Sequence, residues 1–217
     1  MAISLASKFS EKLREDYPII SKNRSKVCCV GINDSDYLTQ PKPNGLVVKC
    51  PIYDTWKNII NRSYNTKLHK TNPTYKDVEV CTEWLVFSNF REWFIKNHID
   101  GYHLDKDIFS KEVKIYSPET CIYIPVWLNS FITANGASRG KYKIGVHWSK
   151  HNKKFVAQIS NPISFKNEFI GYFQQEDLAH NAWLKRKLEL TLELKPEMDK
   201  IDIRIYPNVV NIIHNIK

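Results

Sequence analysis

The stretch IGVHWSKHNKKFVAQIS (144–160), with EFIGYF (168–173) and QQEDLAHNAW (174–183) after it, decides how the second half of this chain folds. The first two pieces alternate apolar and polar residues around short breaks, which is typical of half-exposed strands. The third piece changes to helical spacing, which places Leu178, Ala182 and Leu188 on one face. The pattern therefore predicts a small sheet followed by a helix.

Four short motifs in this region follow the order of a known domain. They are Gly145-Val146, Phe155-Val156-Ala157, Gly171-Tyr172-Phe173 and a helix start at Glu176, Ala179 and Ala182. This order resembles the three-stranded antiparallel sheet plus helix of the plant ethylene-response-factor type DNA-binding domain, which also occurs in endonucleases of phages and mobile elements. The resemblance implies that the partner is double-stranded DNA.

The charge of the chain suits such a partner. Lys and Arg number 32 against 23 Asp and Glu, which gives a net charge of +9. Basic side chains release counterions when they neutralise phosphates, although solvated lysines on an ordinary basic protein give the same total. Their position favours DNA, because basic and aromatic residues alternate at the entry to the sheet: Arg139, Lys141, Lys143, His147, Trp148, Lys150, His151, Lys153 and Lys154.

The resemblance also implies which side chains meet DNA. Alternate residues of the strands would enter the major groove, and we expect these to be His147, Ser149, Gln158, Ser160, Asn167 and Phe169. Phosphates would instead be met by Lys143, Lys150 and Lys154. Trp148 alternates with His147, so we expect it to pack beneath the helix.

Helical spacing also marks the first half. An N-terminal helix is predicted with Leu5, Phe9 and Leu13 on its apolar face. A second helix places Trp56, Ile59, Ile60 and Tyr64 together, and a third carries the aromatic stripe Trp84, Phe87, Phe90 and Phe94. Aromatic stripes at this spacing usually belong to the core.

Residues 53–131 resemble a family of phage-encoded HNH endonucleases. The matching motifs are Trp56…Arg62…Tyr64, the run 80–90 (VCTEWLVFSNF), Leu104-Asp105-Lys106-Asp107 and the run 116–121 (YSPETC). The resemblance implies a ββα-metal unit, built here from strands near 103–109 and 114–125 and the helix at 126–132. Many phage relatives carry this unit and the DNA-binding domain in the same order.

A ββα-metal nuclease needs one divalent ion, a carboxylate or imidazole to hold it, and a base for the attacking water. The resemblance places Asp105 at the metal-binding carboxylate, Lys106 at the general-base histidine and Thr120 at the metal-binding asparagine. The last two depart from the family. A protonated lysine is a base only if its pKa falls strongly, and a hydroxyl is a poorer ligand than a carboxamide.

Two neighbours of Asp105 could compensate. His103 and Asp107 share its face if the strand continues through them, so His103 could supply the base and Asp107 a second carboxylate ligand. The alternative is a surface strand whose charged side chains are simply solvated. We expect one Mg²⁺ or Mn²⁺ per site and no zinc, since none of the five cysteines forms a CxxC pair.

The chain is expected to be an α+β protein in four parts: an N-terminal helix and loop (1–45), the HNH-like unit (46–134), the DNA-binding domain (141–192) and a tail of unassigned role (193–217). The linker is placed at ANGASRGK (134–141). No segment looks like a membrane span or signal peptide. We therefore expect a cytoplasmic monomer, in the host cytoplasm if phage-encoded.

Three functions remain open at this point. The leading one is a metal-dependent phage HNH DNA endonuclease of the homing or nicking type. The second is a non-catalytic DNA-binding protein with a degenerate HNH site. The third is a phage regulatory protein that acts on a host protein, which would not need a basic sheet.

Overall fold

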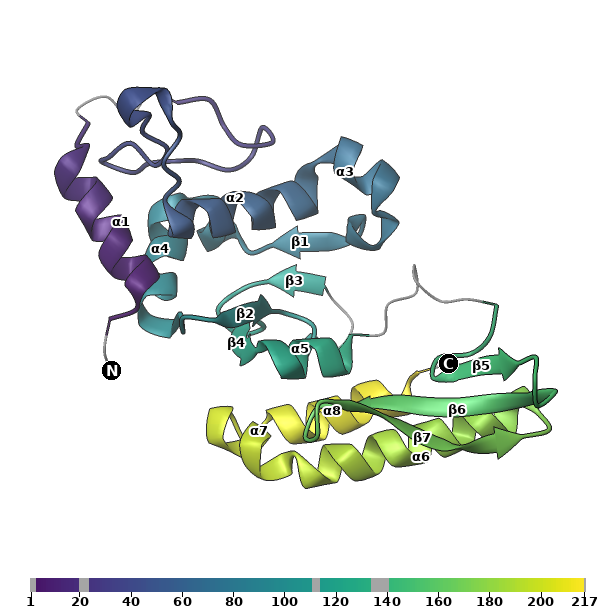
Figure 1. Cartoon of the computed structure of the whole chain (residues 1–217). Helices are drawn as coiled ribbons and strands as arrows, with labels where there is room; N and C mark the ends of the chain where they lie inside the picture. The colour runs from purple at the N-terminus through teal and green to yellow at the C-terminus, as the bar shows by residue number, and fades with distance from the viewer. Residues whose placement is uncertain (1–2, 20–23, 111–113, 134–140, 217) are drawn as a thin grey trace. The chain divides into compact units, whose positions relative to one another are not determined.

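The computed structural model describes residues 3–19, 24–110, 114–133 and 141–216 (Figure 1). The chain divides into two compact units, Met1–Tyr123 and Ile124–Lys217. The division falls inside a strand, earlier than the linker expected at 134–141, of which residues 134–140 lie outside the described part. Helices occur in both units and an antiparallel sheet in the second, so the chain is an α+β protein.

The described residues of the first unit form four helices and several short strands. The helices are α1 (Leu5–Asp16), α2 (Pro51–Tyr64), α3 (Thr66–Thr71) and α4 (Phe87–Asn97), with 3₁₀ turns at Pro43–Gly45, Pro73–Tyr75 and Thr82–Leu85. β1 (Val78–Val80) pairs in parallel with β3 (Lys114–Tyr116). β2 (Tyr102–Asp105) pairs with β4 (Ile122–Pro125).

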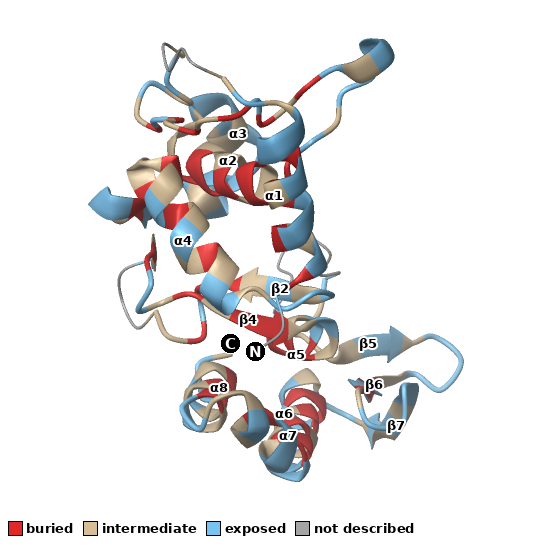
Figure 2. Cartoon of the chain, turned by 90° about the vertical axis from the view of Figure 1, so that its left-hand side faces the viewer, coloured by how far each residue is buried: buried red, intermediate tan, exposed pale blue. Residues whose placement is uncertain are grey.

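Aromatic side chains of α2 and α4 fill the core of this unit, as their spacing predicted, although Trp84 lies in the 3₁₀ turn Thr82–Leu85 and not in the predicted helix. Trp56, Trp84 and Phe90 are fully buried, and Figure 2 shows the buried residues of α2 along one side of the helix. The indole N–H of Trp56 donates to the Trp84 carbonyl at 2.7 Å, which satisfies a polar atom that burial would otherwise penalise. Trp84 and Phe90 meet edge to face, with ring centroids 5.0 Å apart.

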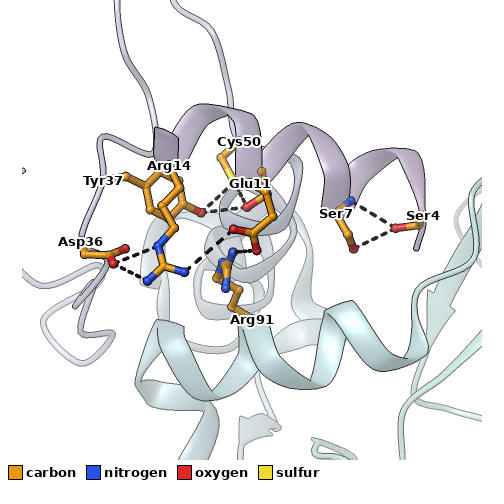
Figure 3. Close-up of polar contacts among 9 residues, drawn as sticks. Ser4, Ser7, Glu11, Arg14, Asp36, Tyr37, Cys50 and Arg91 are labelled. Atoms are coloured by element: carbon orange, nitrogen blue, oxygen red, sulfur yellow. Dashed lines mark hydrogen bonds and ion pairs between the residues drawn. The ribbon is translucent and has the colours of Figure 1, made fainter. Parts of the chain in front are cut away.

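The predicted apolar face of α1 is wrong at Leu5 and Phe9, although the helix itself and the burial of Leu13 are confirmed. Leu5 and Phe9 are exposed, whereas Ser7, Ser10 and Leu13 are buried. Polar contacts fix this rotation (Figure 3). The Ser10 hydroxyl lies 3.0 Å from the Tyr37 hydroxyl, which lies 3.3 Å from Cys50 Sγ.

Two arginines complete this polar network on the exposed side of α1. Arg14 Nε donates to Asp36 at 2.9 Å, and Arg91 of α4 forms an ion pair with Glu11. The Arg14 guanidinium lowers the pKa of Asp36. These contacts join α1 to α4 and to the loop that precedes α2 (Figure 3). The spacing of hydrophobic residues alone does not predict them.

The second unit contains the predicted three-stranded sheet and helix. β5 (Val146–Ser149), β6 (Lys154–Asn161) and β7 (Lys166–Phe173) form an antiparallel sheet in that order. Helix α6 (Glu176–Glu193) packs along one face of it (Figure 1). Ala157 pairs with Gly171 and Gln158 with Phe169, so Ile170 is an extra residue in β7, a bulge.

The buried face of α6 differs from the predicted one. Leu178 is half exposed, whereas Ala179, Trp183 and Leu190 are buried. The approach of Gly145 sets this rotation. Gly145 has φ +79°, and a Cβ on it would lie 2.1 Å from Trp183 Cδ1, so the backbone before β5 lies directly on the indole.

The C-terminal tail, which had no expected role, extends the core of the second unit. Its residues form α7 (Lys195–Ile201) and α8 (Ile205–His214), and α8 packs against α6. Ile205, Val209 and Ile213 are fully buried, so the tail contributes apolar packing that the sheet and helix lack by themselves.

A buried lysine joins α6 to α5 (Val126–Ile132) within the same unit. Lys187 Nζ donates to the Phe131 carbonyl at 2.5 Å, near the C-terminus of α5, where a cation is favourable. Burial lowers the pKa of Lys187 to about 8. The cation also lies 3.5 Å from the centroid of the Phe131 ring, which compensates part of its lost hydration.

All five cysteines are free thiols. Cys28 and Cys29 both have positive φ, at 50° and 64°. Within the described residues, no helix has the length and apolar character that a bilayer crossing requires.

Candidate active site and nucleic-acid interface

Asp105 is a buried carboxylate at the end of β2. Its side chain accepts the Ile108 N–H at 2.9 Å, which fixes its orientation at the start of the following turn. Burial raises the pKa of Asp105 to about 6, helped by the nearby Asp107 carboxylate and opposed by the Ile108 N–H. This buried carboxylate at a strand end stands where the resemblance places the metal-binding anion, and a nearby cation would stabilise its charged form.

Lys106 is also buried, which is unusual for this residue type. Its ammonium forms an ion pair with Asp107 and lies 5.5 Å from the centroid of the Tyr116 ring. The ammonium is therefore held in place beside Asp105. At the position where the resemblance places a general-base histidine, the structure has a lysine held by an ion pair.

Asp107 does not continue the strand face of Asp105, contrary to prediction. The strand ends at Asp105, and the chain then turns, with the Ser110 N–H bonded to the Lys106 carbonyl at 3.2 Å. The strict alternation of side chains therefore stops before Asp107. Its carboxylate is 61 % exposed and pairs with Lys106.

His103 lies two residues before Asp105 on the same strand and is exposed. Strand alternation directs both side chains to the same side of β2. An exposed imidazole therefore lies two residues before the buried carboxylate, on the same side of the strand.

Thr120 lies in the turn between β3 and β4. Its hydroxyl donates to the Ile115 carbonyl at 2.6 Å and accepts the Ser117 N–H at 3.1 Å. The Ser117 N–H and the Ile115 carbonyl thus already engage the oxygen that was predicted to bind the metal. The contacts describe a side chain that stabilises its own turn.

Arg62 and Tyr116 also belong to this site, although sequence reasoning assigned them no role. Arg62 of α2 donates to the buried Tyr116 hydroxyl at 3.4 Å, and Tyr116 of β3 lies beside Lys106. Burial raises the pKa of Tyr116, while Arg62 and Lys106 lower it. Both residues stand in motifs that carry the family resemblance, which was the available signal.

The donor set fits a hard cation that keeps most of its water. Among the described residues, no three His, Cys, Asp or Glu side chains gather as a metal site. Mg²⁺ is commonly held by one or two carboxylates, with water and substrate phosphates completing the shell. Asp105 can supply that single carboxylate, and the neighbouring cations Lys106 and Arg62 suit the phosphate.

The exposed face of the second unit's sheet gathers most of the side chains predicted to read DNA. His147, Gln158, Ser160 and Asn167 line one hollow together with Gly145 and Val146. Phe169 lies opposite Gln158 and is 57 % exposed. Ser149 differs, because its hydroxyl accepts the Asn152 N–H at 3.3 Å in the turn after β5.

The three lysines predicted to meet phosphates have different surroundings. Lys150 lies exposed in the turn between β5 and β6, and Lys154 begins β6. Lys143 forms an ion pair with Asp177 at 2.6 Å, at the N-terminus of α6. Lys143 would have to exchange that partner for a phosphate, so Lys150 and Lys154 are the better candidates.

Trp148 meets Phe155 edge to face at 4.9 Å but keeps 37 % exposure, so it covers the edge of the sheet and is only partly enclosed.

No protein-family model matches the chain, and neither a curated protein nor a solved structure is detectably similar to it. The chemistry of the two sites must therefore be argued from their own residues.

Proposed function

We propose that this protein is a metal-dependent DNA endonuclease of the phage HNH type, homing or nicking, whose second unit binds double-stranded DNA. The buried Asp105 carboxylate carries the proposal. Its raised pKa, its place at a strand end and its neighbours Lys106 and Arg62 combine an anionic anchor with cations. Such a combination suits a site that must hold a metal ion and a phosphodiester together.

Each residue of the proposed site has a distinct task. Asp105 would hold Mg²⁺ or Mn²⁺, which when bound supplies positive charge to the leaving oxygen. Lys106 and Arg62 attract the scissile phosphate, and their partners Asp107 and Tyr116 keep them in place. His103, exposed on the same strand, accepts the proton of the attacking water.

A second function is favoured by specific contacts. The Thr120 hydroxyl is bonded inside its own turn, and Lys106 replaces the family's base. Both contacts suit a DNA-binding protein whose catalytic site has degenerated. In that alternative the protein binds double-stranded DNA but needs no metal ion.

Nicking of supercoiled plasmid separates these two functions. We expect the purified full-length protein to convert supercoiled plasmid to open circles with Mg²⁺ or Mn²⁺ and not with EDTA. His103→Ala should lower the rate by about 10²–10⁴-fold, the usual contribution of a general base. His214→Ala, which removes an exposed imidazole from α8, should leave the rate unchanged. Plasmid that stays supercoiled with every divalent ion, although the protein binds it, would establish the non-catalytic alternative.

DNA binding by the second unit can be tested by how its binding constant depends on salt concentration. Lys150→Ala combined with Lys154→Ala should flatten the slope of log K against log salt by about two units, since each phosphate contact contributes about 0.9. Binding should weaken for all sequences alike. The control is Lys12→Ala with Lys200→Ala, whose ammonium groups pair with Asp16 and Glu197 on their own helices. Equal slopes for both double variants would remove the lysines from the interface.

A further inference from the structure

The exposed sheet face of the second unit has an unusual set of polar groups. A hollow of about 420 Å³ is lined by His147 of β5, Gln158 and Ser160 of β6, and Asn167 of β7. Within the described residues, the side chains of Gln158, Ser160 and Asn167 form no hydrogen bond to the rest of the protein. Their donors and acceptors are available to a ligand.

The register of the strands sets the spacing of these groups. Gln158 lies directly opposite Phe169, and Ser160 lies opposite Asn167. Directly opposed side chains in an antiparallel pair are about 5 Å apart at Cβ, and diagonal ones about 7–8 Å. The two carboxamides, Gln158 and Asn167, are diagonal neighbours. Their separation is close to two base-pair rises of about 3.4 Å each.

The chemistry of the face discriminates between base pairs. Guanine presents two acceptors in the major groove, which arginine or lysine reads best, whereas adenine presents an acceptor and a donor that match a carboxamide. Residues 141–175 contain no arginine. Lys154 and Lys166 begin their strands, Lys150 lies in a turn, and none of these lysines lines the hollow.

The ring of Phe169 offers an apolar surface that suits the methyl group of thymine. The Phe169 ring is 57 % exposed beside Gln158 and is braced edge to face by Tyr172 at 5.0 Å. Thymine carries a methyl group at the major-groove edge, next to the adenine atoms that a carboxamide reads. One cross-strand pair, Gln158 and Phe169, therefore matches both halves of an A·T pair.

We propose that this sheet face reads A·T base pairs in the major groove, with Gln158 and Asn167 bonded to adenines and Phe169 against a thymine methyl. The proposal rests on the DNA-binding function proposed above and adds its sequence preference. It places A·T pairs, not G·C pairs, at the centre of the target.

Selection of duplexes from a random pool by the full-length protein, followed by competition at fixed salt, tests this proposal. The selected sites should contain A·T pairs. Replacing adenine by 7-deazaadenine, or thymine by uracil, should weaken binding at those positions. Gln158→Ala should cost about 5- to 150-fold in preference over G·C, the range for one bidentate base contact. Gln158→Arg should move the preference toward G·C, and Phe169→Ala should abolish the difference between thymine and uracil.

Asn211→Ala, which removes an exposed carboxamide from α8, is the matched control and should keep the wild-type preference. Selected sites rich in G·C, or tight binding without any preference, would overturn the A·T proposal while leaving DNA binding intact. Failure to bind any duplex even at low salt would instead overturn the DNA-binding function on which it rests.

Discussion

Asp105→Asn is expected to abolish metal-dependent nicking and at the same time to make the metal-free protein more stable at pH 7. The carboxamide keeps an oxygen for the Ile108 N–H, so the turn after β2 is preserved. It lacks the negative charge that anchors the ion, and without an anionic ligand a hard cation has little affinity for the site. Binding of DNA, which we propose for the second unit, should be unchanged.

The gain in stability follows from the direction of the pKa shift. The pKa of Asp105 rises from 3.8 to about 6 in the folded protein. The folded state therefore binds the proton more tightly than the unfolded chain, and this contribution is fully present below about pH 4 and lost as the pH rises through 6. Above pH 6 the buried charge lowers the free energy of unfolding by up to about 3 kcal/mol, which asparagine avoids.

Three measurements check this prediction. They are plasmid nicking with Mg²⁺, duplex binding, and urea unfolding in EDTA between pH 4 and pH 8. Asp77→Asn, which neutralises an exposed carboxylate in the turn before β1, should alter none of them. Retained nicking by Asp105→Asn would contradict its assignment as the anchor. Loss of stability at pH 7 would contradict its raised pKa.

Gly145→Ala is expected to unfold the sheet of the second unit. The residue has φ +79°, where any L side chain is strained, and its Cβ would lie 2.1 Å from Trp183. Left-handed backbone costs about 1–2 kcal/mol for a non-glycine residue, and the overlap adds about 1–3 kcal/mol or more. A total of about 2–5 kcal/mol or more is a large part of the stability of a small domain.

A second glycine separates these two costs. Gly101 has φ +81°, and a Cβ on it would meet nothing within 4 Å. Gly101→Ala should therefore cost only the backbone strain, about 1–2 kcal/mol. Amide hydrogen exchange of β2 and β5, the strands that follow the two glycines, together with duplex binding, gives the comparison. Equal losses for the two variants would show that Trp183 does not confine Gly145.

Hydrophobic spacing predicted the elements better than it predicted their rotation. The sheet and the cores of α2 and α4 follow from alternation and aromatic stripes, because burial dominates there. The face of α1 was missed because Ser10 and Glu11 bond to Tyr37 and Arg91, which lie far away in sequence. The face of α6 was missed because a close backbone approach, not apolar area, decides which side Trp183 occupies.

The candidate active site was predicted in part for a similar reason. Asp105 and its neighbours lie in one motif, so the sequence places them together. Arg62 comes from α2 and Tyr116 from β3, and only the folded chain brings them to Lys106. The side chain of Asp107 was assigned to the wrong face because a turn follows Asp105. The alternation of residue types does not predict where a four-residue strand ends.

The parallel pairing of β1 with β3 has a consequence for the order of folding. Val78 pairs with Lys114 and Val80 with Tyr116, so the intervening chain, which includes α4 and β2, must form a loop before the two strands can pair. Closing this loop costs chain entropy before the strand pairing contributes any stability. The sheet β5–β6–β7 joins neighbours through short turns and has low contact order. Synthesis delivers the first unit earlier, yet local pairing allows the second to fold faster. Lys106 and Tyr116 therefore come together only after the slow step, and we expect the sheet β5–β6–β7 to form before they meet.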